Sequence, residues 1–117
     1  ADLLAFLTAV RPPPRVFPGN TPAVVAVRDR RLTLRAADAE IYGTDIAFEG
    51  DFKNVGMWHG PDDRAEWRVS LPKAGTFDVY LDYACDAHSA GNELVILVFV
   101  NPLSASDSVP LVFTSFR

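Results

Sequence analysis

The sequence predicts an all-β protein, an antiparallel β-sandwich (jelly roll) with a short N-terminal helix and a proline-rich linker. Two runs, Trp67–Leu71 and Phe77–Cys85, support this prediction, because every second residue in each is apolar. That period is typical of a strand with one buried face and one face in water. Pro72 and Gly75, between the runs, supply the restricted and the permissive backbone angles that reverse a chain.

The first residues predict a helix that ends at a proline run. Asp2 stands where an N-cap is expected. The apolar residues after it share the i, i+3, i+4, i+7 spacing of one helix face: Leu3, Phe6, Leu7 and Val10. Pro12–Pro14 excludes a helix and imposes an extended spacer. We therefore predict residues 1–11 as the terminal helix of an upstream domain and 12–22 as a linker. Residues 23–117 form the β-sandwich module, complete or truncated at its C-terminus.

Beyond the linker, short segments rich in β-formers alternate with turn residues, which predicts strands. Trp67 lies on the apolar side of its run and is predicted to be core. Cys85, also on the apolar side, is predicted to be a small buried hydrophobe. Leu94–Val100 is apolar throughout, so we expect it at the centre of a sheet with both faces covered. The predicted strands are Ala23–Val27, Leu32–Arg35, Glu40–Tyr42, Ile46–Glu49, Trp67–Leu71, Phe77–Cys85, Glu93–Val100 and Leu111–Thr114.

Composition limits the partners of this chain. The 117 residues carry a net charge of −4, which disfavours nucleic acid and anionic membrane surfaces. The longest apolar run is too short to span a bilayer, so we expect no membrane insertion. Arginines concentrate in Arg28–Arg35, which either contacts a phosphate or carboxylate or forms a solvated strand edge. A single cysteine excludes an internal disulfide.

Three stretches resemble a known module: Ala36–Gly43, Asn54–Trp58 and, above all, Trp67–Cys85. They are similar to the jelly-roll modules of carbohydrate-binding families 6 and 35, and the resemblance covers Leu32–Val98. It implies a non-catalytic accessory module that binds a glycan. Related modules hold calcium through a glutamate where this chain has Ala37, so we do not expect bound calcium here.

The N-terminal residues resemble part of a second family. Asp2–Leu7 is similar to the last helix of a c-type cytochrome domain, and Arg15–Pro22 to the connector that follows it in large exported bacterial haem proteins. This resemblance implies a covalently linked cytochrome upstream and an exported location, periplasmic or at the cell surface. Haem attachment needs Cys-x-x-Cys-His, which this chain lacks, so haem c is expected only in the parent protein.

The candidate ligand-binding residues are Trp58, His59, Asp62, Asp63 and Tyr80. Sugar recognition needs a flat apolar ring and nearby groups that bond hydroxyls, which Trp58 and its neighbours would supply. The alternative is that Trp58 fills the end of the sandwich while the aspartates form a turn. Tyr80, on the polar side of its run, is either a second exposed platform or an ordinary surface aromatic.

No set of residues demands a particular reaction, so we expect no enzyme, no catalytic residue and no metal site. The carboxylates are spread over turns without a pair set for glycoside hydrolysis. Cys85 with His88 offers only two metal ligands. The sequence thus predicts an accessory module that binds a glycan or another surface ligand. The alternative is a structural spacer or a protein-docking domain of an electron-transfer haem protein.

Overall fold

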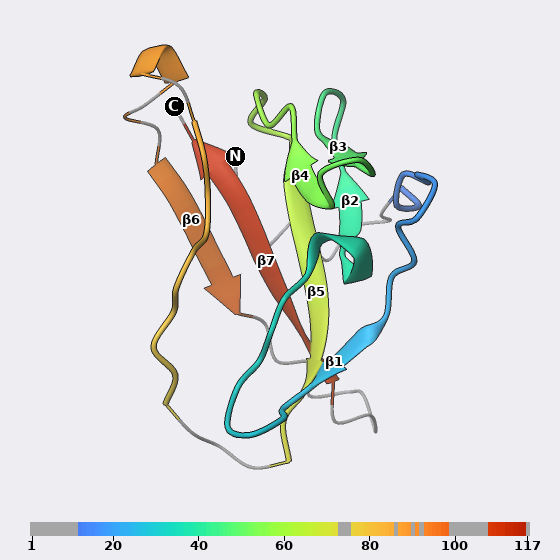
Figure 1. Cartoon of the computed structure of the whole chain (residues 1–117), viewed down its shortest axis with the longest axis vertical. Coiled ribbons are helices and arrows are strands. Elements are labelled where there is room, and N and C mark those ends of the chain that lie inside the picture. The colour runs from blue at the N-terminus through green and yellow to red at the C-terminus, as the bar shows by residue number, and fades with distance from the viewer. Residues whose placement is uncertain are drawn as a thin grey trace.

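The computed structural model describes residues 12–72, 76–85, 87–89, 91, 93–98 and 108–116. The helix predicted within residues 1–11 lies outside this part of the chain. The described elements are strands and two short 3-10 helices, in agreement with the all-β class (Figure 1). They are β1 (Val24–Ala26), η1 (Ala36–Asp38), β2 (Glu40–Tyr42), β3 (Ala47–Glu49), β4 (Asn54–Gly56), β5 (Arg64–Ser70), η2 (Ala87–Ser89), β6 (Glu93–Val98) and β7 (Ser108–Phe116).

Strand β5 is the centre of a five-stranded sheet. The sheet has the order β1-β5-β7-β6, and β2 also pairs with β5 (Figure 1). Its pairings are antiparallel except that of β1 with β5, which is parallel and places Val24 opposite Arg68. A parallel pair needs a long crossover, and residues 27–63 provide one. The prediction of a purely antiparallel arrangement is therefore wrong at β1.

The second sheet is the hairpin of β3 and β4, which pair antiparallel with Phe48 opposite Val55. Both of these side chains pack in or against the buried core. The sequence patterns do not predict β4, because Asn54 and Gly56 are poor strand formers. A complete sandwich or jelly roll stays a prediction, since the described part of the chain holds these two small sheets.

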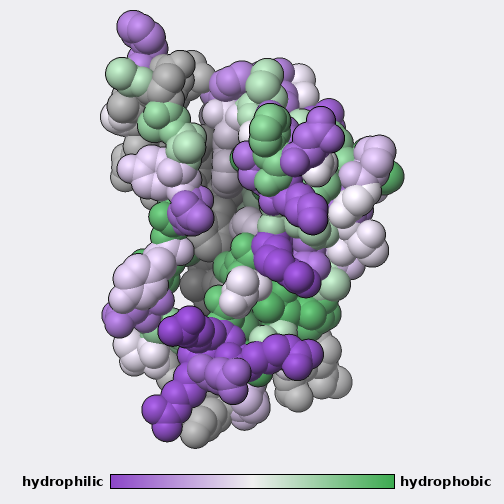
Figure 2. All heavy atoms as spheres, in the orientation of Figure 1, coloured by the Kyte–Doolittle hydropathy of each residue, from purple (hydrophilic) through white to green (hydrophobic). Residues whose placement is uncertain are grey.

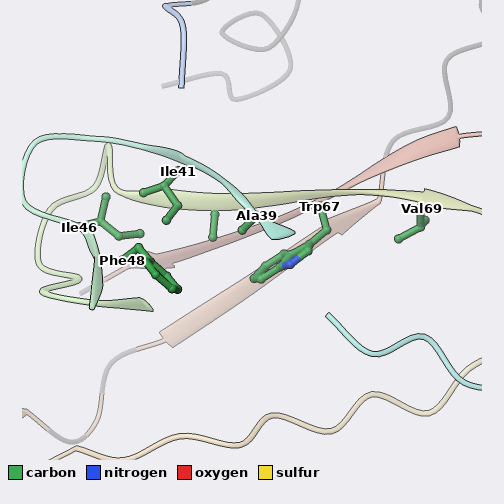
Figure 3. Close-up of a cluster of buried hydrophobic side chains, with 7 residues drawn as sticks. Ala39, Ile41, Ile46, Phe48, Trp67 and Val69 are labelled. Carbon is green, nitrogen blue, oxygen red and sulfur yellow. The ribbon is translucent and has the colours of Figure 1, made fainter. Parts of the chain in front are cut away.

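The core lies against one face of β5. Ala65, Trp67 and Val69 alternate along this face and are buried, which confirms the prediction for Trp67 (Figure 3). The indole N–H of Trp67 donates to the carbonyl oxygen of Arg35 at 2.7 Å, and such a bond is what a buried indole requires. The other members of the buried cluster are Ala39, Ile41, Ile46 and Phe48.

The opposite face of β5 holds buried charges. Arg64 and Glu66 are almost fully buried and form an ion pair, with 3.0 Å between Nε and Oε2. The Arg64 guanidinium also lies over the ring of Tyr42, 4.3 Å from its centroid. Buried charges are tolerated when they are paired, so this ion pair allows both faces of β5 to be covered. Arg68 and Glu40 pair where this face is more exposed, at 3.5 Å between Nε and Oε2.

Segment 76–85 departs furthest from its prediction. The sequence predicts a strand with Val79 and Leu81 in the core, but the segment runs along the molecule and pairs with none of the described strands (Figure 1). Val79 and Leu81 are 62% and 52% exposed, and Cys85 is exposed as well. Alternation of apolar residues shows only that a chain suits an extended conformation. A strand also needs a hydrogen-bonded neighbour, and none of the described strands pairs with this segment.

The strand prediction over Leu32–Arg35 is wrong, and the one over Glu93–Val100 is right in type but not in position. Leu32–Arg35 forms no described strand, and the chain just before it makes only an isolated bridge between Arg28 and Arg31. The strand predicted over Glu93–Val100 is confirmed over Glu93–Val98 as β6, but its expected place at the centre is wrong, because β6 lies at the outer end of the strand order and Ile96 is exposed. The inner position belongs to β7, which is long enough to pair with β5 and β6 together.

Residues 15–21, which lie within the predicted linker, are hydrogen-bonded to the β-rich body. The backbone N–H of Arg15 donates to the carbonyl oxygen of Ile41 at 2.8 Å. Asn20 is buried, and its side-chain amide donates to three carbonyl oxygens, those of Ala36, Ala37 and Ala39. These bonds hold the entering chain against η1 and the strand that follows it.

Candidate binding cleft

Through its carboxylate, Asp63 bonds the backbone of the loop at residues 58–63, which contains most of the predicted site residues. Its carboxylate is buried; Oδ2 accepts from the N–H groups of His59 (3.0 Å) and Gly60 (2.8 Å), and Oδ1 from that of Asp45 (3.2 Å). Burial raises the pKa of Asp63, but the backbone N–H groups of Gly60, His59, Ile46 and Asp45 outweigh it and lower the pKa below its usual 3.8. Asp63 is therefore an anion whose carboxylate fixes the backbone at Asp45, His59 and Gly60.

Trp58 lies half-buried against the core cluster. Its indole N–H donates to the carbonyl oxygen of Asp63 at 2.9 Å. Met57, just before it, has a φ of 57°, a left-handed angle that is unfavourable for a residue other than glycine. These contacts are those expected of a tryptophan that packs inward, with the aspartates in the adjoining turn.

The structure separates the five predicted site residues. His59 and Asp62 are exposed, and Asp62 Oδ2 accepts from the hydroxyl of Thr44 at 3.0 Å. Tyr80 is 89% exposed and comes from segment 76–85. Trp58 and Tyr80 line one cleft, whereas the other three predicted residues are not part of its lining.

That cleft, of about 2430 Å³, opens on the apolar face of β5. Trp67 and Val69 on β5 and Ile96 on β6 contribute to its lining, together with residues 30–37, the β3–β4 hairpin and segment 76–85. Figure 2 shows the hollow running down this face of the molecule. Small-molecule pockets are usually about 300–1,000 Å³, so this cleft suits an extended occupant.

Segment 76–85 is an exposed apolar wall of the cleft. Its exposed apolar side chains alternate along the segment: Phe77, Val79, Leu81 and Tyr83. No backbone hydrogen bond joins the segment to another residue that the structure describes. An unpaired, apolar strand edge is a template for pairing with another chain. The sequence signal for this wall was the alternation itself, which by itself does not distinguish a core strand from a surface that binds a partner.

Side chains of both charges line the cleft. Arg30, Arg31 and Lys53 are among its cations, and Asp78 and Asp82 are carboxylates of segment 76–85. All five side chains are exposed. An occupant of the cleft therefore meets both cations and carboxylates, in addition to the apolar lining.

A strained turn presents the arginines. Arg28 and Arg31 exchange backbone hydrogen bonds, both of 2.9 Å, around Asp29 and Arg30. The φ angles of Asp29 and Arg30 are 51° and 64°, in the left-handed region that two-residue hairpin turns usually fill with Asn or Gly. In Figure 2 hydrophilic atoms gather at the lower end of the face, where this turn lies. The arginines are exposed, but the described residues form only an isolated bridge between Arg28 and Arg31 here, so the strand edge predicted for Arg28–Arg35 is not present.

The described residues contain no group of three or more His, Cys, Asp or Glu side chains arranged to hold a metal ion. None of the described helices has the length and apolarity to cross a membrane. Compared with protein-family models, curated proteins and solved structures, the chain has no match. The resemblance to carbohydrate-binding modules and cytochrome connectors therefore rests on the quoted residues alone, and the functions it implies are proposals.

Proposed function

We propose that this chain is a non-catalytic docking module that binds an extended polypeptide by strand addition along residues 76–85. One observation supports this function above others: segment 76–85, with alternating exposed apolar side chains and no backbone hydrogen bond to another described residue, borders an open cleft on the apolar face of the sheet. In strand addition, main-chain hydrogen bonds supply affinity and alternate side chains enter pockets. Segment 76–85 would supply the main-chain hydrogen bonds, and the cleft would receive the alternate side chains.

Burial of the exposed apolar side chains would drive the binding. Complete burial of a Val, Leu or Phe side chain contributes about 1.5–3 kcal/mol. Val79 and Leu81 each expose more than half of their surface, so covering them recovers a large part of that value. Aliphatic side chains of this kind make no stacking contact with sugar rings, which favours a polypeptide as the occupant.

The test uses a synthetic peptide of alternating valine and serine, with hydrogen–deuterium exchange of the full chain. We expect the peptide to protect the amides of residues 77–83, and Val79→Asp to abolish this protection. Val16→Asp, at an exposed position outside the cleft, is the matched control, and circular dichroism checks that both variants fold. No protection at about 1 mM peptide, where a complex of about −4 kcal/mol is half formed, would overturn the proposal.

A second candidate function, glycan binding, is favoured by the aromatic side chains along the same cleft. Phe52, Tyr80 and Tyr83 are exposed and line it together with Trp58, and flat rings stack on sugar faces. We expect weak binding, roughly 0.1–1 mM or about −5 kcal/mol. Calorimetry with soluble polysaccharides tests it: heat that Tyr80→Ala and Trp58→Ala abolish supports this function, and no heat with any polysaccharide excludes it.

The proposed parent protein is tested separately. An upstream cytochrome and an exported location follow from the resemblance of the N-terminal residues. A Cys-x-x-Cys-His motif encoded before Ala1 would support both, and an upstream reading frame without it would contradict them. A structural spacer, the remaining alternative, would bind neither the peptide nor any polysaccharide.

A further inference from the structure

We infer that the partner's docking strand carries basic side chains, Lys or Arg, at alternate positions between apolar ones. This inference rests on the proposed strand addition along residues 76–85 and specifies the chemistry of the partner. It comes from two carboxylates of the segment, Asp78 and Asp82, which line the cleft and form no ion pair within the described part of the chain.

The spacing of the segment puts the two carboxylates on one side. Residues two apart in an extended chain lie on the same side. Asp78, Tyr80 and Asp82 therefore share one side, and the other side is apolar: Phe77, Val79, Leu81 and Tyr83. A strand added alongside places its apolar residues beside this second set. Its intervening residues then lie beside the carboxylates.

The short distance between paired strands allows the charges of Asp78 and Asp82 to change the affinity for an added strand. Opposed side chains on paired strands have Cβ atoms about 4.5–5.5 Å apart, so opposite charges attract and like charges repel. Lysines opposite Asp78 and Asp82 should together tighten binding roughly tenfold over neutral residues, and glutamates should weaken it by a similar factor. Salt screens both effects.

The same charges disfavour a second copy of this chain as the occupant. Two-fold antiparallel pairing centred on Tyr80 would bring Val79 beside Leu81 of the other copy, but it would also set Asp78 against Asp82. Each chain in addition has a net charge of −4, so the approach of two copies is repulsive. A basic strand meets neither obstacle.

The cations that line the cleft restrict where the partner's basic side chains can lie. Arg30, Arg31 and Lys53 would repel lysines placed beside them. The basic side chains therefore belong next to Asp78 and Asp82, while the apolar side chains of the partner contact the apolar lining of the cleft. Charge complementarity of this kind selects partners more than it adds affinity.

The experiment compares three peptides of equal length, in which valine alternates with lysine, with serine or with glutamate. Fluorescence anisotropy measures their binding to the full chain in low salt. We expect the lysine peptide to bind at least tenfold more tightly than the glutamate peptide. The difference should vanish in Asp78→Asn/Asp82→Asn and shrink sharply in about 0.5 M salt. Both positions are exposed and Asn is isosteric with Asp, so the variant keeps the fold.

Asp45→Asn/Asp51→Asn, at two exposed positions outside the cleft lining, changes the net charge equally and should keep the preference. Equal binding of all three peptides would overturn the inference and leave strand addition standing. Failure of every peptide to bind would instead remove strand addition itself. Sedimentation showing a dimer of the full chain that Val79→Asp dissolves would make a second copy the occupant and would also overturn the inference.

Discussion

Arg15 and Asp63 both bond the backbone of the loop at residues 43–46. Arg15 binds its carbonyl oxygens and Asp63 binds one of its N–H groups. Nη1 of Arg15 donates to the carbonyl oxygens of Gly43 (3.3 Å) and Thr44 (3.1 Å), and Oδ1 of Asp63 accepts from the backbone N–H of Asp45 (3.2 Å). The loop lies between β2 and β3, outside both sheets. These two side chains therefore supply the hydrogen bonds that a strand neighbour would otherwise give its backbone.

Asp63→Asn should destabilise the fold by about 2–3 kcal/mol. The substitution removes charge-assisted hydrogen bonds and points amide donors at backbone donors. Urea unfolding followed by tryptophan fluorescence measures the loss. Asp62→Asn, at the exposed neighbouring position, should change stability by no more than about 0.5 kcal/mol. Equal costs for the two substitutions would show that Asp63 has no special role.

The stabilisation by Asp63 should disappear in acid. Burial raises its pKa, but the N–H groups of Gly60, His59, Ile46 and Asp45 lower it below the usual 3.8. Because the folded pKa lies below the unfolded one, the contribution is complete above the unfolded pKa, about 3.9, and is lost as pH falls through the folded pKa.

The difference in unfolding free energy between wild type and Asp63→Asn is the measurement that checks this pH dependence. We expect it to be constant from about pH 5 to 7 and to shrink below about pH 4. A difference that stays constant down to about pH 2 would contradict the lowered pKa.

Gly43→Ala should cost about 3 kcal/mol or more. Gly43 has a φ of +129°, and a Cβ there would collide with Oδ1 of Asp63 and lie 2.7 Å from its Cα. Backbone strain and overpacking then add. Gly91→Ala is the matched control, because Gly91 has a φ of +94° and open space around it. It should cost only the strain, about 1–2 kcal/mol. Thermal unfolding of the two variants compares them directly.

Arg64→Met should cost about 3–5 kcal/mol, because it removes the ion-pair partner of the buried Glu66 carboxylate. Adding Glu66→Leu should restore much of the stability, since a buried ion pair can be replaced by apolar side chains at little cost. Arg68→Met, whose pair with Glu40 is more exposed, should cost less than about 1 kcal/mol. A double variant no more stable than Arg64→Met would contradict this account.

Sequence reasoning succeeded where a local pattern coincided with a buried neighbour. The bounds of β2 agree with the prediction residue for residue, and Trp67 and Val69 are core as their alternation indicates. The prediction failed over Phe77–Cys85, whose alternation is equally clear. Asp63 stays a predicted ligand-binding residue, and its bond to Asp45, eighteen positions earlier, has no local signature in the sequence.

The sequence by itself determined the all-β class, the alternation of buried and exposed side chains towards the end of β5 and the turn before it, because these depend on residues near one another along the chain. The tertiary structure alone decided that β1 runs parallel to β5, that β7 displaces β6 from the centre, and that segment 76–85 borders a cleft instead of filling a core. Strand pairing and burial are contacts between distant segments, and an alternating pattern records the conformation of a strand without recording its neighbour.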